Sequence, residues 1–198
     1  MPSLNLVSAA AAGGGMSPPM SVPIAGRWYS SHNGLEPGAL ASRAADHLHL
    51  MPVLFPCDVT LDRISIDCSV TNSANARLGL YNNASSGLSR PGTLLVESAS
   101  FAISTSTGAN DQTIDETLSG GTLYWACICL DAAATVRTYT GSDSGISYGG
   151  TAGDGALNTH ARRAEIDHTF AALPADNSAT ALTIASGSNA LITMRVAS

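Results

Sequence analysis

Two pairs of side chains that can bind a metal ion stand out in this sequence, His47 with His49 and Cys127 with Cys129. Residues two apart in an extended strand project from the same face, so each pair could supply two ligands of a tetrahedral zinc site. The Cys-x-Cys spacing lacks the turn that preorganises the thiolates of a Cys-x-x-Cys pair. Alternation of the histidines with leucines also fits an ordinary strand with one exposed face. We therefore predict no metal and no other cofactor.

Catalytic chemistry has little support in the residue pattern. The chain has many serines and five histidines, but no Gly-x-Ser-x-Gly motif that would expose a nucleophile. Asp115 and Glu116 are neighbours on an expected strand, so their carboxylates face opposite sides and cannot work as a pair. The absence of lysine excludes Schiff-base chemistry and a phosphate-binding P-loop. We predict no catalytic residues and a protein that is not an enzyme.

Alternation of apolar and polar residues predicts the strands that hold these side chains. In residues 59–70 the apolar residues occupy one parity up to Leu61 and the other parity from Ile64 onward. A period of two indicates a strand with one face in a core, and the parity switch is typical of a bulge or of a bend between two sheets. Residues 123–130 are almost continuously apolar, which is typical of a central strand buried on both faces and places Trp125 in the core.

Short strands separated by turns rich in Gly, Asn and Ser predict an all-β protein, an antiparallel β-sandwich of jelly-roll type. A helix is expected only at Glu36–Ala45, where Pro37 suits a first helical turn. The expected strands are residues 46–55, 58–71, 76–82, 93–103, 111–116, 121–130, 135–140, 166–170, 180–185 and 189–197.

The first 26 residues are rich in Ala, Gly, Pro and Ser and cannot form a core of their own. We expect residues 1–26 to be an extended N-terminal anchoring arm held by a partner, and residues 27–45 to lead into a sandwich domain at 46–198. Aromatic side chains concentrate binding energy at interfaces, so Trp28 and Tyr29 suit an anchor. The predicted interface residues are Leu4, Leu6, Val7, Met16, Met20, Ile24, Arg27, Trp28 and Tyr29.

The charge balance argues against nucleic acid and membranes as partners. The formal net charge is −6, and Arg162-Arg163 is the only basic doublet, whereas phosphate neutralisation needs clustered cations. No run approaches the roughly 20 apolar residues that span a bilayer. The N-terminus also lacks the basic start of a secretory signal.

The four cysteines favour a reducing compartment. A chain of 198 residues can build a sizeable core without disulfides, so we interpret the cysteines as small hydrophobic thiols, buried where strand parity is apolar. A single bridge, either Cys57–Cys68 or one between the sheets, is the alternative.

A set of runs stands out along the expected strands: Leu61–Ile66, Arg77–Asn82, Pro91–Glu97, Leu118–Ala126, Leu173-Pro174 and Ala190–Val196. As a set they resemble a recurrent β-sandwich of tailed-phage virions over about residues 46–197. The resemblance implies a structural or adhesive role: a capsid decoration or cement protein, a vertex or head fibre, or a tail-tip module. We further expect a virion protein made in the host cytoplasm, a homo-oligomer with a trimer favoured, and the major capsid protein or other virion proteins as partners.

A tail-associated receptor- or carbohydrate-binding module is the alternative function. In that case exposed loop residues would recognise a host surface glycan, and the candidates are Tyr139, Tyr148 and Asn158. Asp143 and Asp154 in the same Gly- and Ser-rich stretch lack the dense acidic spacing of a calcium loop, so we expect an ordinary surface loop there.

Overall fold

The computed structural model describes residues 22–30, 40–68, 73–84, 90–103, 108–139, 163–185 and 188–198. These residues form fourteen strands and no helix, which confirms the prediction of an all-β protein. Within the same ranges no helix is long and apolar enough to cross a membrane.

The strands form three antiparallel sheets. The first has the order β1 (Trp28–Ser30), β14 (Ile192–Val196), β4 (Val59–Cys68), β8 (Gly108–Leu118). The second has the order β12 (Thr183–Ala185), β11 (Arg163–Asp167), β3 (His47–Leu54), β9 (Leu123–Leu130), β5 (Asn75–Asn83), β6 (Pro91–Glu97), and β7 (Phe101–Ala102) also pairs with β5. The third has the order β13 (Asn189–Ala190), β10 (Ala134–Tyr139), β2 (Leu40–Arg43).

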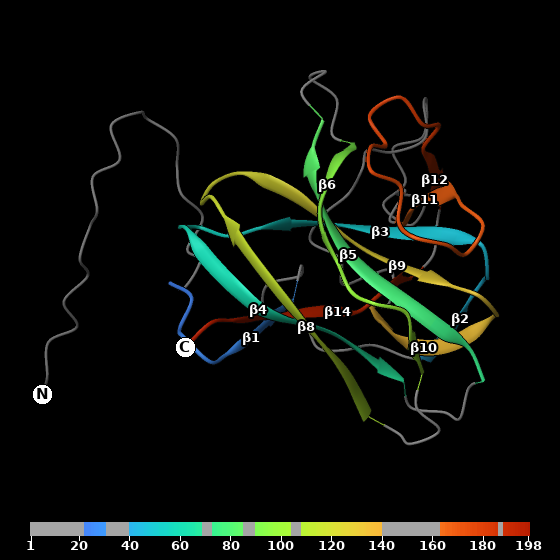
Figure 1. Cartoon of the computed structure of the whole chain (residues 1–198), viewed down its shortest axis with the longest axis horizontal. Coiled ribbons are helices and arrows are strands. Elements are labelled where there is room, and N and C mark those ends of the chain that lie inside the picture. Colours follow the sequence, from blue (N-terminus) through green and yellow to red (C-terminus); the bar gives the residue numbers. More distant parts are fainter. Residues whose placement is uncertain are drawn as a thin grey trace, which may run out of the picture.

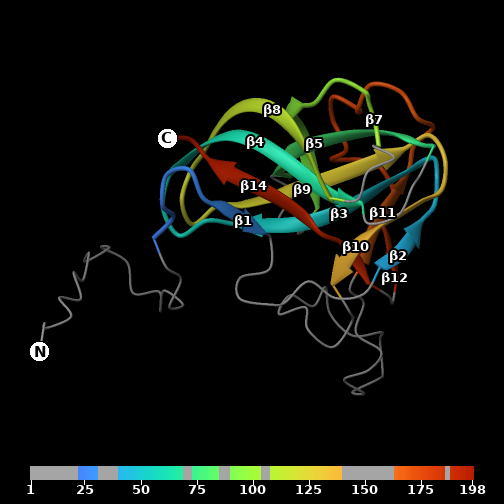
Figure 2. The same ribbon diagram turned by 90° about the horizontal axis from the view of Figure 1, so that it is seen from below.

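Eight of these strands follow a jelly-roll path, which confirms the predicted sandwich. Taken in chain order they are β1, β3, β4, β5, β6, β8, β9 and β14. The four-stranded sheet contains the first, eighth, third and sixth of them, in the order β1, β14, β4, β8. The larger sheet contains the second, seventh, fourth and fifth side by side, in the order β3, β9, β5, β6. Figure 1 shows β5 and β9 crossing the molecule together, and Figure 2 shows β1, β14 and β4 side by side in the other sheet. This alternation between two sheets is the double Greek key of a jelly roll.

The larger sheet is buried on both faces. One face packs on the four-stranded sheet through a cluster that includes Met51, Ile128 and Ile64. The opposite face forms a second cluster around Trp125, which the chain after β11 covers with Leu173 and other apolar side chains. The prediction that Trp125 belongs to the core is confirmed, and its indole Nε1 donates a hydrogen bond to Asn83 Oδ1 at 3.0 Å.

The parity switch in β4 is a register shift. The pairing of β4 with β8 slips between Leu61 and Arg63, and the apolar side chains on both sides of the slip are buried in the same core. Against β14, β4 carries one extra residue between Leu61 and Arg63, and such a bulge restores the inward direction of the apolar side chains after the parity changes. The sequence therefore predicts this irregularity correctly.

The small third sheet lies at one end of the sandwich, far from the C-terminus in both views (Figures 1 and 2). In β2 the predicted helix at Glu36–Ala45 is wrong for Leu40–Arg43, because these residues pair in antiparallel register with β10. Arg43 is buried there, and its Nη2 donates to Ser188 Oγ at 2.8 Å. A partner strand that satisfies the backbone outweighs the local helix signal of Pro37; residues 36–39 lie outside the described ranges.

The remaining strand predictions differ from the structure mainly at their ends. The expected strand 93–103 is interrupted, since β6 ends at Glu97 and β7 is a separate short strand. β11 begins at Arg163, earlier than the expected strand 166–170. β1 is not among the expected strands, because three residues are too few for a period-two pattern to be visible.

All four cysteines are free, which confirms their interpretation as thiols. Cys68, Cys127 and Cys129 are buried, and Cys57 is partly exposed. Burial raises the pKa of Cys68 to about 11 and the pKa of Cys129 to about 11, so these thiols stay protonated near neutral pH.

The turn between β8 and β9 offers a test of the packing. A Cβ added at Gly120 would overlap the backbone of Cys57, whereas one at Gly121 would meet open space but at a positive φ of 69°. We expect Gly120→Ala to lower the free energy of unfolding by about 3 kcal/mol and Gly121→Ala by about 1–2 kcal/mol. Urea denaturation of both variants measures the difference. Equal losses, or a smaller loss for Gly120→Ala, would contradict the close packing of this turn.

Candidate interaction surface

The described chain begins just before β1, the strand at one end of the four-stranded sheet. β1 lies at the end of the strand order and pairs only with β14 among the described strands. The chain enters β1 through a β-turn in which the Arg27 N–H donates to the Ile24 carbonyl at 3.2 Å, with Gly26 at a φ of 75°. A positive φ at the third residue is the conformation of a type II turn. The predicted arm is therefore bent, not extended, at its last residues, while residues 1–21 lie outside the described ranges.

The predicted anchor residues separate into a packed side chain and exposed ones. Tyr29 packs against the core, with its ring centroid 6.3 Å from that of Phe55. Its hydroxyl accepts a hydrogen bond from the Ile24 N–H at 2.7 Å. Trp28, on the opposite parity, lies on the outer face, where the guanidinium carbon of Arg195 is 5.9 Å from the ring centroid. Tyr29 thus fixes the strand, and Trp28 remains available to a partner.

Three exposed apolar residues lie within a seven-residue stretch where the chain enters β1. Val22 is 71% exposed, Ile24 56% and Trp28 39%, and they are three of the five large apolar residues that are exposed in the described ranges. Val22 is a member that the sequence reasoning missed. Apolar side chains close together on a surface are typical of an interaction site. We call Val22, Ile24 and Trp28 the β1 apolar strip.

An ion pair fixes the side chain below Trp28. Arg195 donates from Nε to Asp62 Oδ1 at 2.8 Å and from Nη2 to Oδ2 at 2.7 Å, the bidentate geometry that guanidinium and carboxylate favour. The hydrogen bond from Arg195 holds the pKa of Asp62 below its ordinary value. Arg195 is thereby held in place under the indole, so Trp28 has a defined position before any partner arrives.

Most of the other residues predicted to take part in recognition lie outside the described ranges. Leu4, Leu6, Val7, Met16 and Met20 lie outside the described ranges, and so do Tyr148 and Asn158. Tyr139 ends β10, where it pairs with Asn189; its side chain also lies outside what the structure describes. Arg27 is described and exposed.

The histidine and cysteine pairs lie on opposite faces of the larger sheet. Cys127 and Cys129 stand opposite Leu50 and Leu48 of β3, so they share the face of those leucines and not that of the histidines. The zinc arrangement that combines both pairs is therefore not formed. Within the described ranges no group of three or more His, Cys, Asp or Glu side chains could hold a metal ion.

The histidines instead form a ladder with the carboxylates of β11. Nδ1 of His49 lies 2.6 Å from Glu165 Oε1, and Nδ1 of His47 lies 3.0 Å from Asp167 Oδ1. Each pair stands directly opposite in the β3–β11 register. The matching spacing of Glu165-x-Asp167 is the sequence signal that could have revealed this ladder. The ladder therefore links the side chains of β11 and β3, two neighbouring strands of the larger sheet.

The ion pair beneath Trp28 predicts a pH dependence. The pKa of Asp62 lies below its ordinary value of 3.8, so the stabilisation by Arg195 is present above that pH and is lost as the pH falls through the lower folded-state pKa. We expect Arg195→Gln to raise the pKa of Asp62 toward 3.8, as followed by NMR of its carboxyl carbon.

Arg63→Gln is the matched control for this titration. Arg63 donates its side-chain hydrogen bonds to the Asp62 carbonyl and to Thr113 Oγ1, not to the Asp62 carboxylate. Its removal should therefore raise the pKa of Asp62 less than removal of Arg195 does. An equal rise in both variants would show that the bidentate pair is not the main cause.

No protein-family model and no curated protein matches this chain. Its function is therefore argued from its residues and their geometry.

Proposed function

We propose that this protein is a non-enzymatic structural component of a phage virion, a capsid decoration or cement protein or a vertex or head fibre, attached through its N-terminal segment. The observation that carries the attachment is the β1 apolar strip, which lies where the chain enters the outermost described strand of the four-stranded sheet. The assignment to a virion rests on the resemblance of the strand runs to phage β-sandwiches. Jelly rolls occur in viral capsid and lectin domains among others, so the fold agrees with this assignment without deciding it.

The strip and the strand edge support attachment in two ways. Full burial of a large apolar side chain stabilises a complex by about 1.5–3 kcal/mol, so Val22, Ile24 and Trp28 together offer substantial binding energy. Among the described strands β1 has no neighbour on its outer side, where an extended segment of a partner could add as a further strand. Both contributions act where the N-terminal segment leaves the sandwich.

An arm needs such contacts because ordering it is costly. Each residue fixed against a partner loses about 1–2 kcal/mol of backbone entropy, so residues 1–21 must make extensive contacts. The apolar residues Leu4, Leu6, Val7, Met16 and Met20 would supply them. A homo-oligomer, with a trimer favoured, would present several arms at once and raise the avidity for a symmetric particle surface.

Co-sedimentation with phage particles that lack this protein tests the proposal. The full chain should sediment with the particles, and deletion of residues 1–21 should abolish this while the thermal unfolding of the sandwich is unchanged. Failure of the full chain to bind would contradict a virion role. Full binding by the deletion variant would contradict attachment through the arm.

Substitutions in the β1 apolar strip test the anchor separately. Trp28→Ala should weaken particle binding about 30-fold, the effect of losing about 2 kcal/mol at the centre of an interface. Leu54→Ala is the matched control, because Leu54 is a similarly exposed apolar residue at the end of β3, outside the strip. The anchor is refuted if both variants bind like the unaltered chain.

A further inference from the structure

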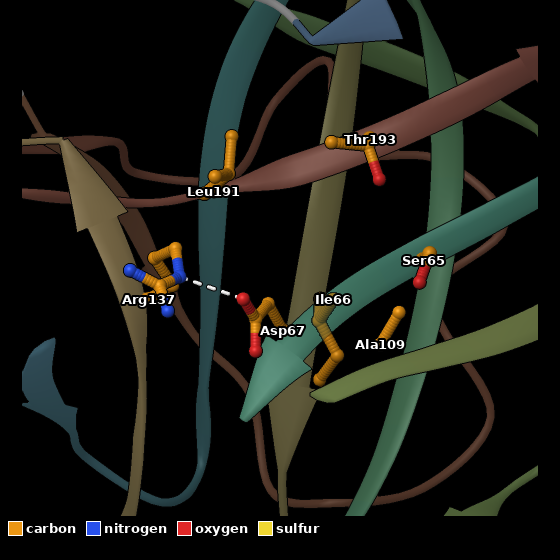
Figure 3. A pocket seen from close by; sticks show the side chains of 7 residues that line it. All are labelled: Ser65, Ile66, Asp67, Ala109, Arg137, Leu191 and Thr193. Carbon is orange, nitrogen blue, oxygen red and sulfur yellow. Dashed lines mark hydrogen bonds and ion pairs between the residues drawn. The ribbon is translucent and has the colours of Figure 1, made fainter. Parts of the chain in front are cut away.

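A hollow of about 370 Å³ opens at the seam between the four-stranded sheet and the small third sheet. Its walls come from β4, β8, β10 and the start of β14. Figure 3 shows Asp67 and Arg137 facing each other on one side of the hollow, and Ser65 and Thr193 on the other. The volume is near the lower end of the range of small-molecule sites, about 300–1,000 Å³.

An ion pair across the seam gives this hollow its charged groups. Arg137 Nε donates to Asp67 Oδ2 at 2.6 Å, and both side chains are partly exposed. Asp67 Oδ1 is buried and has no hydrogen-bond partner among the described residues, so Oδ2, which faces Arg137, is the acceptor on this side. The pair is neutral as a whole, yet it places a hydrogen-bond acceptor beside a guanidinium donor.

Hydroxyl groups form the second polar element of the hollow. Thr193 and Ser65 stand directly opposite each other on β14 and β4, so their side chains share the outer face of the sheet. Ser65 is buried and its Oγ donates to Asp111 Oδ1 at 2.7 Å, whereas Thr193 is partly exposed and is the hydroxyl that a ligand can reach. A hydroxyl can serve as donor or acceptor, so this side also suits a ligand with hydroxyl groups.

The rest of the lining is apolar. Ile66 on β4, the methyl group of Ala109 on β8 and Leu191, the residue before β14, contribute to it. Ala109 is exposed and stands opposite Asp67 in the β4–β8 register. An aliphatic surface beside fixed polar groups matches a ligand that has C–H groups on one side and hydroxyls around its rim.

We propose that this hollow binds one ring of a neutral saccharide. An anionic ligand would meet the Asp67 carboxylate next to Arg137. A purely apolar ligand would remove both charged groups from water without replacing their hydrogen bonds. A sugar ring offers vicinal hydroxyls to the ion pair and to the hydroxyl side chains, and its C–H groups to Leu191 and Ala109. This site does not depend on the virion assignment, and it differs from the loop tyrosines that the sequence suggests for glycan recognition.

Blocking the hollow tests the proposal. The probes are glucose, galactose, mannose and N-acetylglucosamine, titrated separately into the full chain and followed by amide NMR. At least one should shift the amide signals of Ala109 and Thr193 saturably, with a dissociation constant in the millimolar range. Ala109→Trp fills the space from an exposed position without removing a side-chain hydrogen bond, so it should weaken that binding about tenfold or more.

Thr117→Trp is the matched control, since Thr117 is exposed at the other end of the same strand, β8. It should bind the sugar as the unaltered chain does. Asp67→Asn keeps the side-chain shape and removes the charge; it should weaken binding by a similar factor while thermal unfolding reports whether the variant is folded.

Three results would overturn the proposal. The first is that none of the four sugars shifts these signals. The second is that Ala109→Trp binds as well as Thr117→Trp. The third is that glucuronate binds while its neutral counterpart glucose and the other sugars do not, because the site would then select an anion.

Discussion

The central strands of the larger sheet are apolar on both faces. Most of the other elements lie where they cover one face or the other. A sheet with two apolar faces needs two layers of cover. The four-stranded sheet covers the face that carries Ile128 and Met51. The chain after β11 covers the face with Trp125, where Leu173 fits against Gly79, at which any side chain would overlap it. The Leu173 N–H donates to Glu97 Oε2 at 2.8 Å, so the cover is also tied by a hydrogen bond to β6.

The same constraint explains which features the sequence reveals. A continuous apolar run such as residues 123–130 needs no partner to be recognised, so the burial of Trp125 is predictable. The slip at Leu61 is visible because the parity of apolar residues changes within one strand. The free cysteines follow from the size of this core, which needs no disulfide.

Other features exist only because distant segments meet. Leu40–Arg43 is a strand because β10 pairs with it, and no local pattern in residues 36–45 predicts that pairing. Trp28 is identified as an anchor from its aromatic type, but Val22 has no local signal and is known as part of the surface only from its exposure. The hollow is the extreme case: Asp67 and Arg137 are 70 positions apart and meet only after β10 docks at the end of β4. Spacing in the sequence carries no information on such a pair.

The β1 apolar strip and the hollow are joined by one strand, β14. Arg195 lies opposite Trp28 near one end of this strand, and Leu191 precedes its other end. Four residues of an extended strand span about 13 Å, so a partner could cover the indole and leave the hollow open to small molecules. Pairing with β4 holds β14 along its length, with its one irregularity at Arg195 and Val196, beside the anchor and away from the hollow. Attachment and ligand binding can therefore occur on one rigid sheet without competing for the same side chains.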